Sequence, residues 1–70
     1  MKYKISLPEE ETLTIEVYNS IGASVYKQDN IKVDRLLEGN INLKSLNDGV
    51  YSICLRGVRT YLTRRIIIRN

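Results

Sequence analysis

The sequence predicts an all-β fold, a small antiparallel immunoglobulin-like β-sandwich of six to seven short strands. Three observations indicate this fold. Apolar and polar residues alternate with a period of two along most of the chain, as in strands with one buried face. Turn-forming residues recur roughly every eight to twelve residues, a spacing typical of sandwiches. No segment repeats apolar residues at helical spacing over three turns, so no amphipathic helix is expected.

The first three expected strands lie before residue 29. Lys2–Leu7 alternates most regularly and ends at Pro8, which cannot donate a hydrogen bond to a strand ladder. Thr12–Tyr18 places its aliphatic residues on one face. Ala23–Gln28 returns as its partner after a turn at Asn19–Gly22, so a hairpin is expected here.

The range Asp29–Gly39 permits two interpretations. Ile31–Val33 alternates as a short strand would, whereas Arg35–Glu38 fits either a strand or a single helical turn. Beyond this range, Ile41 and Leu43 alternate with polar residues. Another short strand is therefore expected there.

The remaining strands follow a tight turn. Asn47–Gly49 supplies residues that tolerate a positive φ, and Gly49 is expected to require one. Every residue of Val50–Leu55 except Ser52 is apolar, so both faces are apolar, which predicts a central strand. A turn at Arg56–Arg59 then leads to a long final strand over Thr60–Ile68.

Inward-alternating residues of these strands form the predicted core. A chain of 70 residues allows one domain with a thin core, because chains this short bury only about 60% of their unfolded surface. Cys54 is the single cysteine, so it forms no disulfide within the chain and is expected to act as a small buried hydrophobe. The predicted core consists of Ile5, Leu7, Leu13, Ile15, Val17, Val25, Ile41, Leu43, Leu46, Tyr51, Ile53, Leu55, Leu62, Ile66 and Ile68.

The formal net charge of +3 is unevenly distributed. The last fifteen residues contain five arginines and no acidic residue, whereas Glu9–Glu11 and Glu16 lie near the start. A basic stripe can bind nucleic acid. Strand arginines also keep an exposed sheet edge soluble and resistant to mispairing. The modest net charge favours this second interpretation.

Catalysis, cofactor binding and metal binding have no candidate residues. The chain lacks histidine, the usual acid–base residue and metal ligand, so Cys54 has no partner that would form a thiolate. The run Glu9–Glu11 beside Pro8 is interpreted as a solvated loop rather than a carboxylate site. No uninterrupted apolar run is longer than that of Ile66–Ile68, which is far too short for a membrane span. The sequence therefore predicts a domain that is not an enzyme.

Three motifs occur in a fixed order along the chain. The first reads IEVYNSIGASV over Ile15–Val25 and places a glycine at Gly22. The second reads LNDGVY and contains Leu46, Gly49 and Tyr51. The third is the basic-apolar-basic ending Arg64–Arg69.

Together these motifs resemble the type A C-terminal sorting domain of cargo proteins of the type IX secretion system of Bacteroidetes. That family has an I-x-V-Y-N-x-x-G-x-x-V segment, then Leu-(often Pro)-x-Gly-x-Tyr, then a final apolar strand rich in Lys and Arg. The resemblance covers Thr12–Asn70. Two features depart from it: Asn47 replaces the usual proline, and Leu7–Glu11 replaces a Tyr-Pro-Asn-Pro-like entry.

The resemblance implies a non-catalytic secretion signal. Residues 1–70 would be a single domain at the end of a larger secreted precursor, whose own N-terminus carries a signal peptide. The passenger in cis would enter the periplasm, and the type IX secretion apparatus would move it across the outer membrane. A sortase-like C-terminal signal peptidase would then remove the domain, leaving the passenger released or attached to surface lipopolysaccharide.

The expected recognition residues are in the last strand: Arg64, Arg65, Ile67 and Arg69. Two other functions fit the composition. One is a generic extracellular β-sandwich that serves as an adhesion or spacer module. The other is a small basic β-barrel that binds nucleic acid, which would place basic residues and exposed aromatic rings on one face. No cofactor is expected for any of the three.

Overall fold

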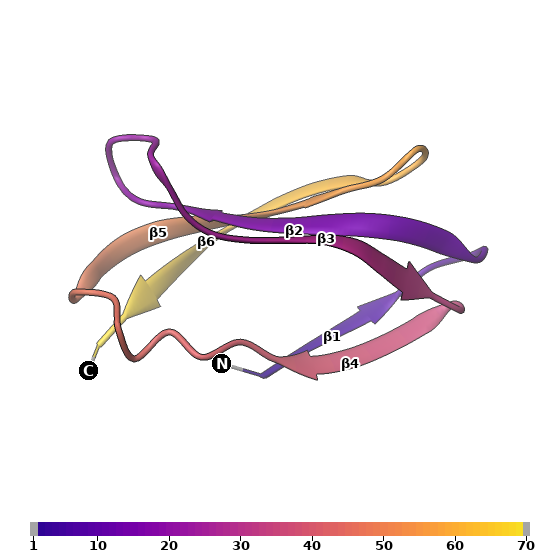
Figure 1. Ribbon diagram of the computed structural model, residues 1–70, viewed down its shortest axis with the longest axis horizontal. Coiled ribbons are helices and arrows are strands. Elements are labelled where there is room, and N and C mark those ends of the chain that lie inside the picture. The colour runs from indigo at the N-terminus through magenta and orange to yellow at the C-terminus, as the bar shows by residue number, and fades with distance from the viewer. Residues whose placement is uncertain (1, 70) are drawn as a thin grey trace.

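The computed structural model describes residues 2–69, which form six strands and no helix. The strands are β1 (Lys2–Ser6), β2 (Glu11–Tyr18), β3 (Ser24–Val33), β4 (Leu36–Asn40), β5 (Gly49–Arg56) and β6 (Tyr61–Ile68). Four of them form an antiparallel sheet in the order β3-β2-β5-β6, and β1 pairs with β4 in a second, smaller sheet. The two sheets lie one above the other (Figure 1). This arrangement confirms the predicted small immunoglobulin-like sandwich.

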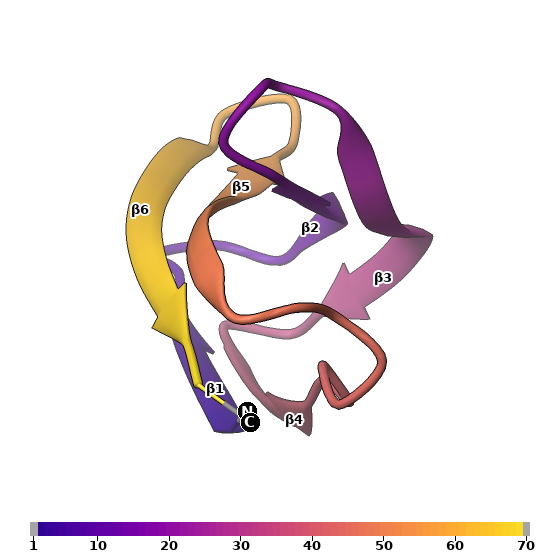
Figure 2. The same cartoon turned by 90° about the vertical axis from the view of Figure 1, so that its left-hand side faces the viewer.

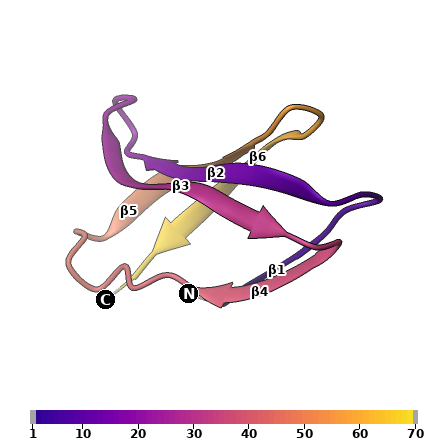
Figure 3. The ribbon, with the colours of Figure 1, turned by 45° about the vertical axis from the view of Figure 1, so that its right-hand side comes forward.

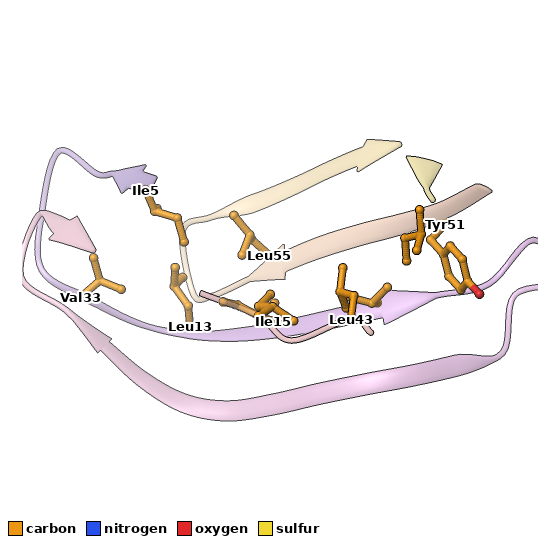
Figure 4. Packing of buried hydrophobic residues seen from close by; sticks show 10 residues of the cluster. Ile5, Leu13, Ile15, Val33, Leu43, Tyr51 and Leu55 are labelled. Atoms are coloured by element: carbon orange, nitrogen blue, oxygen red, sulfur yellow. The ribbon is translucent and has the colours of Figure 1, made fainter. Parts of the chain in front are cut away.

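The core lies between the two sheets (Figure 4). On β2, Leu13, Ile15 and Val17 alternate inward and are almost completely buried, as their spacing predicts. Tyr51 and Leu55 of β5 meet them from the neighbouring strand. The complete buried cluster consists of Ile5, Leu13, Ile15, Val17, Val33, Ile41, Leu43, Tyr51, Leu55 and Ile68. Leu7, Val25, Leu46, Ile53 and Ile66, which were also predicted, are partly buried against it.

Two residues depart from the predicted core. Leu62 is 37% exposed, although it pairs with the buried Leu55 and therefore faces the same side of the sheet. The end of the larger sheet that carries the β5–β6 turn points away from β1 and β4 (Figures 1 and 3). The smaller sheet therefore does not cover the start of β6, where Leu62 lies. Val33 is fully buried at the end of β3 but was left out of the prediction.

Strand β3 is longer than predicted because a bulge joins two expected strands. The register of β2 against β3 shifts between Leu13 and Ile15, where β3 carries one extra residue. Asn30 adopts a φ of 57°, which asparagine tolerates better than most residues. The Thr14 hydroxyl donates to Oδ1 of Asp29 at 3.0 Å beside the bulge. The strand therefore bends without ending.

Of the ambiguous segment Arg35–Glu38, Leu36–Glu38 lies in β4 and Arg35 forms the bend before it, so the alternative of a helical turn is wrong. Arg35 has a φ of 66°, and the chain reverses sharply there from β3 into β4. Its carbonyl accepts a hydrogen bond from the Leu7 backbone N–H at 2.8 Å. Tyr3 of β1 lies opposite Gly39, and its ring occupies the space where a Cβ would be. These contacts hold the segment extended.

The strand predicted around Ile41 and Leu43 does not form, although both side chains are buried. Oδ1 of Asn42 accepts a hydrogen bond from the Lys44 N–H at 3.1 Å. The Leu46 N–H donates to the Leu43 carbonyl at 3.1 Å and closes a turn. The chain therefore turns before Asn47, because local hydrogen bonds by asparagine compete with strand pairing.

Candidate recognition surface on the C-terminal strand

The first sequence motif builds the β2–β3 hairpin. Oδ1 of Asn19 accepts hydrogen bonds from the backbone N–H groups of Ile21 and Ala23 at 3.2 and 2.9 Å. Gly22 has a φ of 86° in open space, so its conformation, rather than a close neighbour, requires glycine. This motif therefore shapes the β2–β3 loop, and Gly22 has a structural role there because it adopts a positive φ.

The second motif builds the entry to β5. The Tyr51 hydroxyl donates to the Asn47 carbonyl at 2.7 Å, and Leu46 packs against the core. Gly49 has a φ of 157°, which confirms that the position needs a positive φ. Leu46, Gly49 and Tyr51 together fix where β5 begins.

The β5–β6 turn is fastened to the start of β2. Oε1 of Glu11 accepts hydrogen bonds from the N–H groups of Arg59 and Thr60 at 2.7 and 3.2 Å, and Oε2 accepts one from the Thr60 hydroxyl at 2.7 Å. These bonds, led by that from Arg59, lower the pKa of Glu11. A Cβ at Gly57 would collide with Glu11 and Leu13, so glycine lets the carboxylate approach. Glu11 is thus an anchor, contrary to the prediction that the whole glutamate run is a solvated loop.

A second polar cluster lies on the outer face of the larger sheet. Glu16 is only 8% exposed and forms an ion pair with Arg56, Nη2 to Oε1, at 2.6 Å. The Tyr18 hydroxyl donates to the same carboxylate at 2.7 Å and accepts from Arg56 at 3.0 Å. Cys54 is buried below the guanidinium, with its Sγ 3.7 Å from Nη1. Cys54 is therefore buried, as predicted, and it lies on the face of the sheet that carries Glu16.

The hydrogen bonds to Glu16 have a large effect on its titration. A hydrogen bond from the Ser24 side chain, followed by those from Tyr18 and Arg56, lowers the pKa of Glu16 to about 2. The hydrogen bond to Glu16 raises the pKa of Tyr18. The sequence contains one signal of this cluster, since Ser52, Cys54 and Arg56 alternate onto the face opposite Tyr51 and Leu55.

Glu16→Gln should flatten the acid dependence of stability. Because the pKa of Glu16 in the fold lies below its ordinary 4.5, its contribution is complete above that pH and is lost as pH falls toward about 2. Thermal melts across this range should shift less in Glu16→Gln than in the unaltered chain. Part of the dependence remains, because the pKa of Glu11 is lowered too. Glu10→Gln, on an exposed loop residue, is the matched control; an equal acid dependence in Glu16→Gln would contradict the cluster.

The five C-terminal arginines fall into two groups. Arg56 pairs with Glu16, and Arg59 pairs with Glu9 beside the β5–β6 turn. Within residues 2–69, the side chains of three others form no salt bridge with a carboxylate. These unpaired and exposed residues are Arg64, Arg65 and Arg69.

Three of the four expected recognition residues, Arg64, Arg65 and Ile67, lie on an edge strand. Among the described strands, β6 pairs with β5 alone and forms one edge of the larger sheet; Figure 2 shows it as the yellow arrow beside β5. Arg65 and Ile67 share the outer face, opposite Ser52 and Val50 of β5, whereas Arg64 faces the other side.

Arg69 follows the end of β6 and is exposed. Ile67 is 63% and Val50 46% exposed, so an apolar pair lies beside the basic residues. Sequence reasoning missed Val50, which it placed in a strand apolar on both faces. The basic β6 surface, defined as Arg64, Arg65, Ile67, Arg69 and Val50, can contact an acidic partner that also carries apolar side chains.

Comparison with known proteins places the chain beside one family. The sequence matches the family described as the secretion system C-terminal sorting domain over residues 2–69. A search of curated proteins and a search of solved structures each found no match. In the described part of the chain, no helix is long and apolar enough to cross a membrane.

Proposed function

Because this chain belongs to the family of secretion system C-terminal sorting domains, we propose that it directs a passenger protein across the outer membrane. The signal of this family serves the type IX secretion system, implies an origin in Bacteroidetes and leads to the cell surface or to secretion. The family is a class of non-catalytic targeting domains, and this chain accordingly has no enzymatic activity of its own.

The proposal extends to the path of the passenger. Residues 1–70 form one domain at the end of a larger precursor, and the passenger precedes β1. It crosses the periplasm before the type IX secretion apparatus recognises the folded domain. A sortase-like C-terminal signal peptidase then removes the domain, and the passenger is released or attached to surface lipopolysaccharide.

The observation that best supports recognition at β6 is that only some of the five arginines form ion pairs with glutamates. Arg56 and Arg59 pair with glutamates, whereas Arg64, Arg65 and Arg69 are exposed and form no salt bridge with a carboxylate among residues 2–69. Unpaired surface charges steer association and give specificity more than they stabilise the fold. An acidic receptor surface is therefore the partner that the basic β6 surface fits.

Reversing two charges, Arg65→Glu with Arg69→Glu, should lower export of a fused passenger in a host with the type IX machinery. Both side chains are exposed, so the free energy of unfolding should change by no more than about 0.5 kcal/mol each. The measurements are the passenger fraction outside the outer membrane and the melting curve of the isolated domain.

Lys32→Glu with Lys44→Glu is the matched control, because it reverses two exposed positive charges away from β6. Normal export of the Arg65/Arg69 variant would exclude the charged terminal strand as the recognised element. If the unaltered fusion itself remains in the periplasm, the sorting function is wrong.

A further inference from the structure

The backbone of β6 forms hydrogen bonds with β5 along one edge, and its other edge has no neighbouring strand among the described residues. The turn after β5 closes with the Gly57 N–H donating to the Thr60 carbonyl at 2.8 Å, and the register then runs without a shift to Ile68. Hydrogen-bonded and non-hydrogen-bonded pairs alternate along an antiparallel ladder. The N–H and C=O groups of Leu62, Arg64 and Ile66 therefore point to β5. Those of every second residue point away from the sheet: Tyr61, Thr63, Arg65 and Ile67.

Arg64 covers part of this open edge. Its Nη1 donates to the carbonyl of Thr63 at 3.2 Å, and Thr63 is one of the residues whose backbone points outward. Because the Arg64 side chain is exposed, an incoming strand can displace it from the Thr63 carbonyl. Basic side chains at sheet edges oppose pairing with other copies of a similarly charged chain. The same charges favour a strand that carries carboxylates.

The opposite edge of the same sheet is less suited to pairing. Strand β3 contains the bulge at Asn30 and two register shifts against β2, and such irregularities twist an edge away from a straight partner. Strand β6 has no register shift over its 8 residues. Of the two edges of this sheet, the edge of β6 is the regular one.

We propose that the open edge of β6 binds an extended acidic segment of its partner by strand addition. The added strand presents adjacent carboxylates opposite Arg64 and Arg65, one on each face of the sheet. It presents apolar residues opposite Leu62 and Ile67, whose side chains are exposed. Main-chain hydrogen bonds give affinity in this mode, and the alternating side chains give specificity. The inference rests on the proposed sorting function for its biological partner, but the edge is tested without it.

The test is a titration of the domain with the acetylated and amidated peptide TVTEETVT. This sequence reads the same in both directions, so it places Glu opposite Arg64 and Arg65, and Val opposite Leu62 and Ile67, in either orientation. Amide hydrogen exchange should slow by at least about tenfold at Tyr61, Thr63, Arg65 and Ile67, because outward N–H groups become hydrogen-bonded. The peptide TVTQQTVT should bind at least about fivefold more weakly, and added salt should weaken only the acidic peptide.

Two proline variants separate the edge from the fold. Thr63→Pro removes an outward N–H, which an edge strand tolerates, so the domain should stay folded and lose peptide binding. Arg64→Pro removes a ladder bond to β5 and should unfold the end of the sheet. In the secretion assay, Thr63→Pro should retain the passenger in the periplasm.

The outcomes distinguish the two proposals. Peptide binding without protection of the four outward amides, protection at β3 instead, or no binding would each overturn strand addition at β6. Normal export by Thr63→Pro would do the same while leaving the sorting function intact. If the unaltered fusion fails to export but the peptide protects the edge, the sorting function fails and the acidic-strand site stands.

Discussion

Ile15→Ala is expected to unfold a large fraction of the domain at room temperature. Ile15 is completely buried at the middle of β2, in register with Leu55 of β5, and belongs to the core between the sheets. Truncating a buried isoleucine to alanine costs about 2–5 kcal/mol, through lost burial and the cavity left behind. A single thin core rarely supplies more than about 3–5 kcal/mol in so short a chain. Urea unfolding followed by circular dichroism measures the loss.

Ile67→Ala is the matched control for this prediction. It makes the same chemical change within a strand, but Ile67 is 63% exposed on β6. Its effect on the free energy of unfolding should stay within about 0.5 kcal/mol. Equal losses in the two variants would contradict the assignment of the core to the space between the sheets. Ile67→Ala should also weaken peptide binding, since its side chain borders the open edge.

Alternation identified which face each residue occupies, but it could not show whether a second layer covers that face. Leu13, Ile15 and Val17 were placed inward correctly because the smaller sheet covers the middle of β2. Leu62 follows the same alternation and is exposed, because a two-stranded layer does not reach the start of β6. Coverage depends on how many strands each sheet contains, which periodicity does not determine.

Backbone irregularities were the other source of error. Asn30 and Arg35 adopt positive φ values, although neither is glycine. Asparagine tolerates a positive φ, but nothing in the sequence marked a bulge at Asn30 or a reversal at Arg35. The prediction therefore divided β3 and left the strand at Leu36–Asn40 ambiguous. Around Ile41 the alternation was real and the side chain is buried, but the Asn42 side chain accepts a hydrogen bond from the Lys44 N–H, and no strand forms there. Burial was predictable there, whereas hydrogen-bond partners were not.

The candidate site was predicted in part for a similar reason. The sequence shows a basic terminal strand, but it does not show which of the five arginines form ion pairs within the fold. Arg56 and Glu16 lie 40 residues apart in the chain, so only the pairing of β2 with β5 reveals their ion pair. The fold therefore gives Arg56 and Arg59 a glutamate partner each, which distinguishes them from the other three arginines. The contacts of Arg64, Arg65, Ile67 and Arg69 with a partner stay a prediction.

Gly49→Val should lower the free energy of unfolding by roughly 1–3 kcal/mol, the cost of holding a branched residue in a sparsely allowed backbone region. Gly49 has a φ of 157°, and the nearest atom to an added Cβ is Tyr51 Cε1 at 3.8 Å, an ordinary contact. The penalty should thus come from the backbone rather than from a collision. Thermal and urea melts measure it.

Gly49→Ala separates these two causes. If the backbone is responsible, alanine and valine should both destabilise the domain by about 1 kcal/mol or more, whereas a lack of space would spare alanine. An unchanged melting curve would show that the turn tolerates a side chain. Gly49 pairs with Ile68, so strain at the start of β5 acts on the end of β6. In the secretion assay, Gly49→Val should therefore impair export together with stability, whereas the Arg65/Arg69 variant should impair export alone.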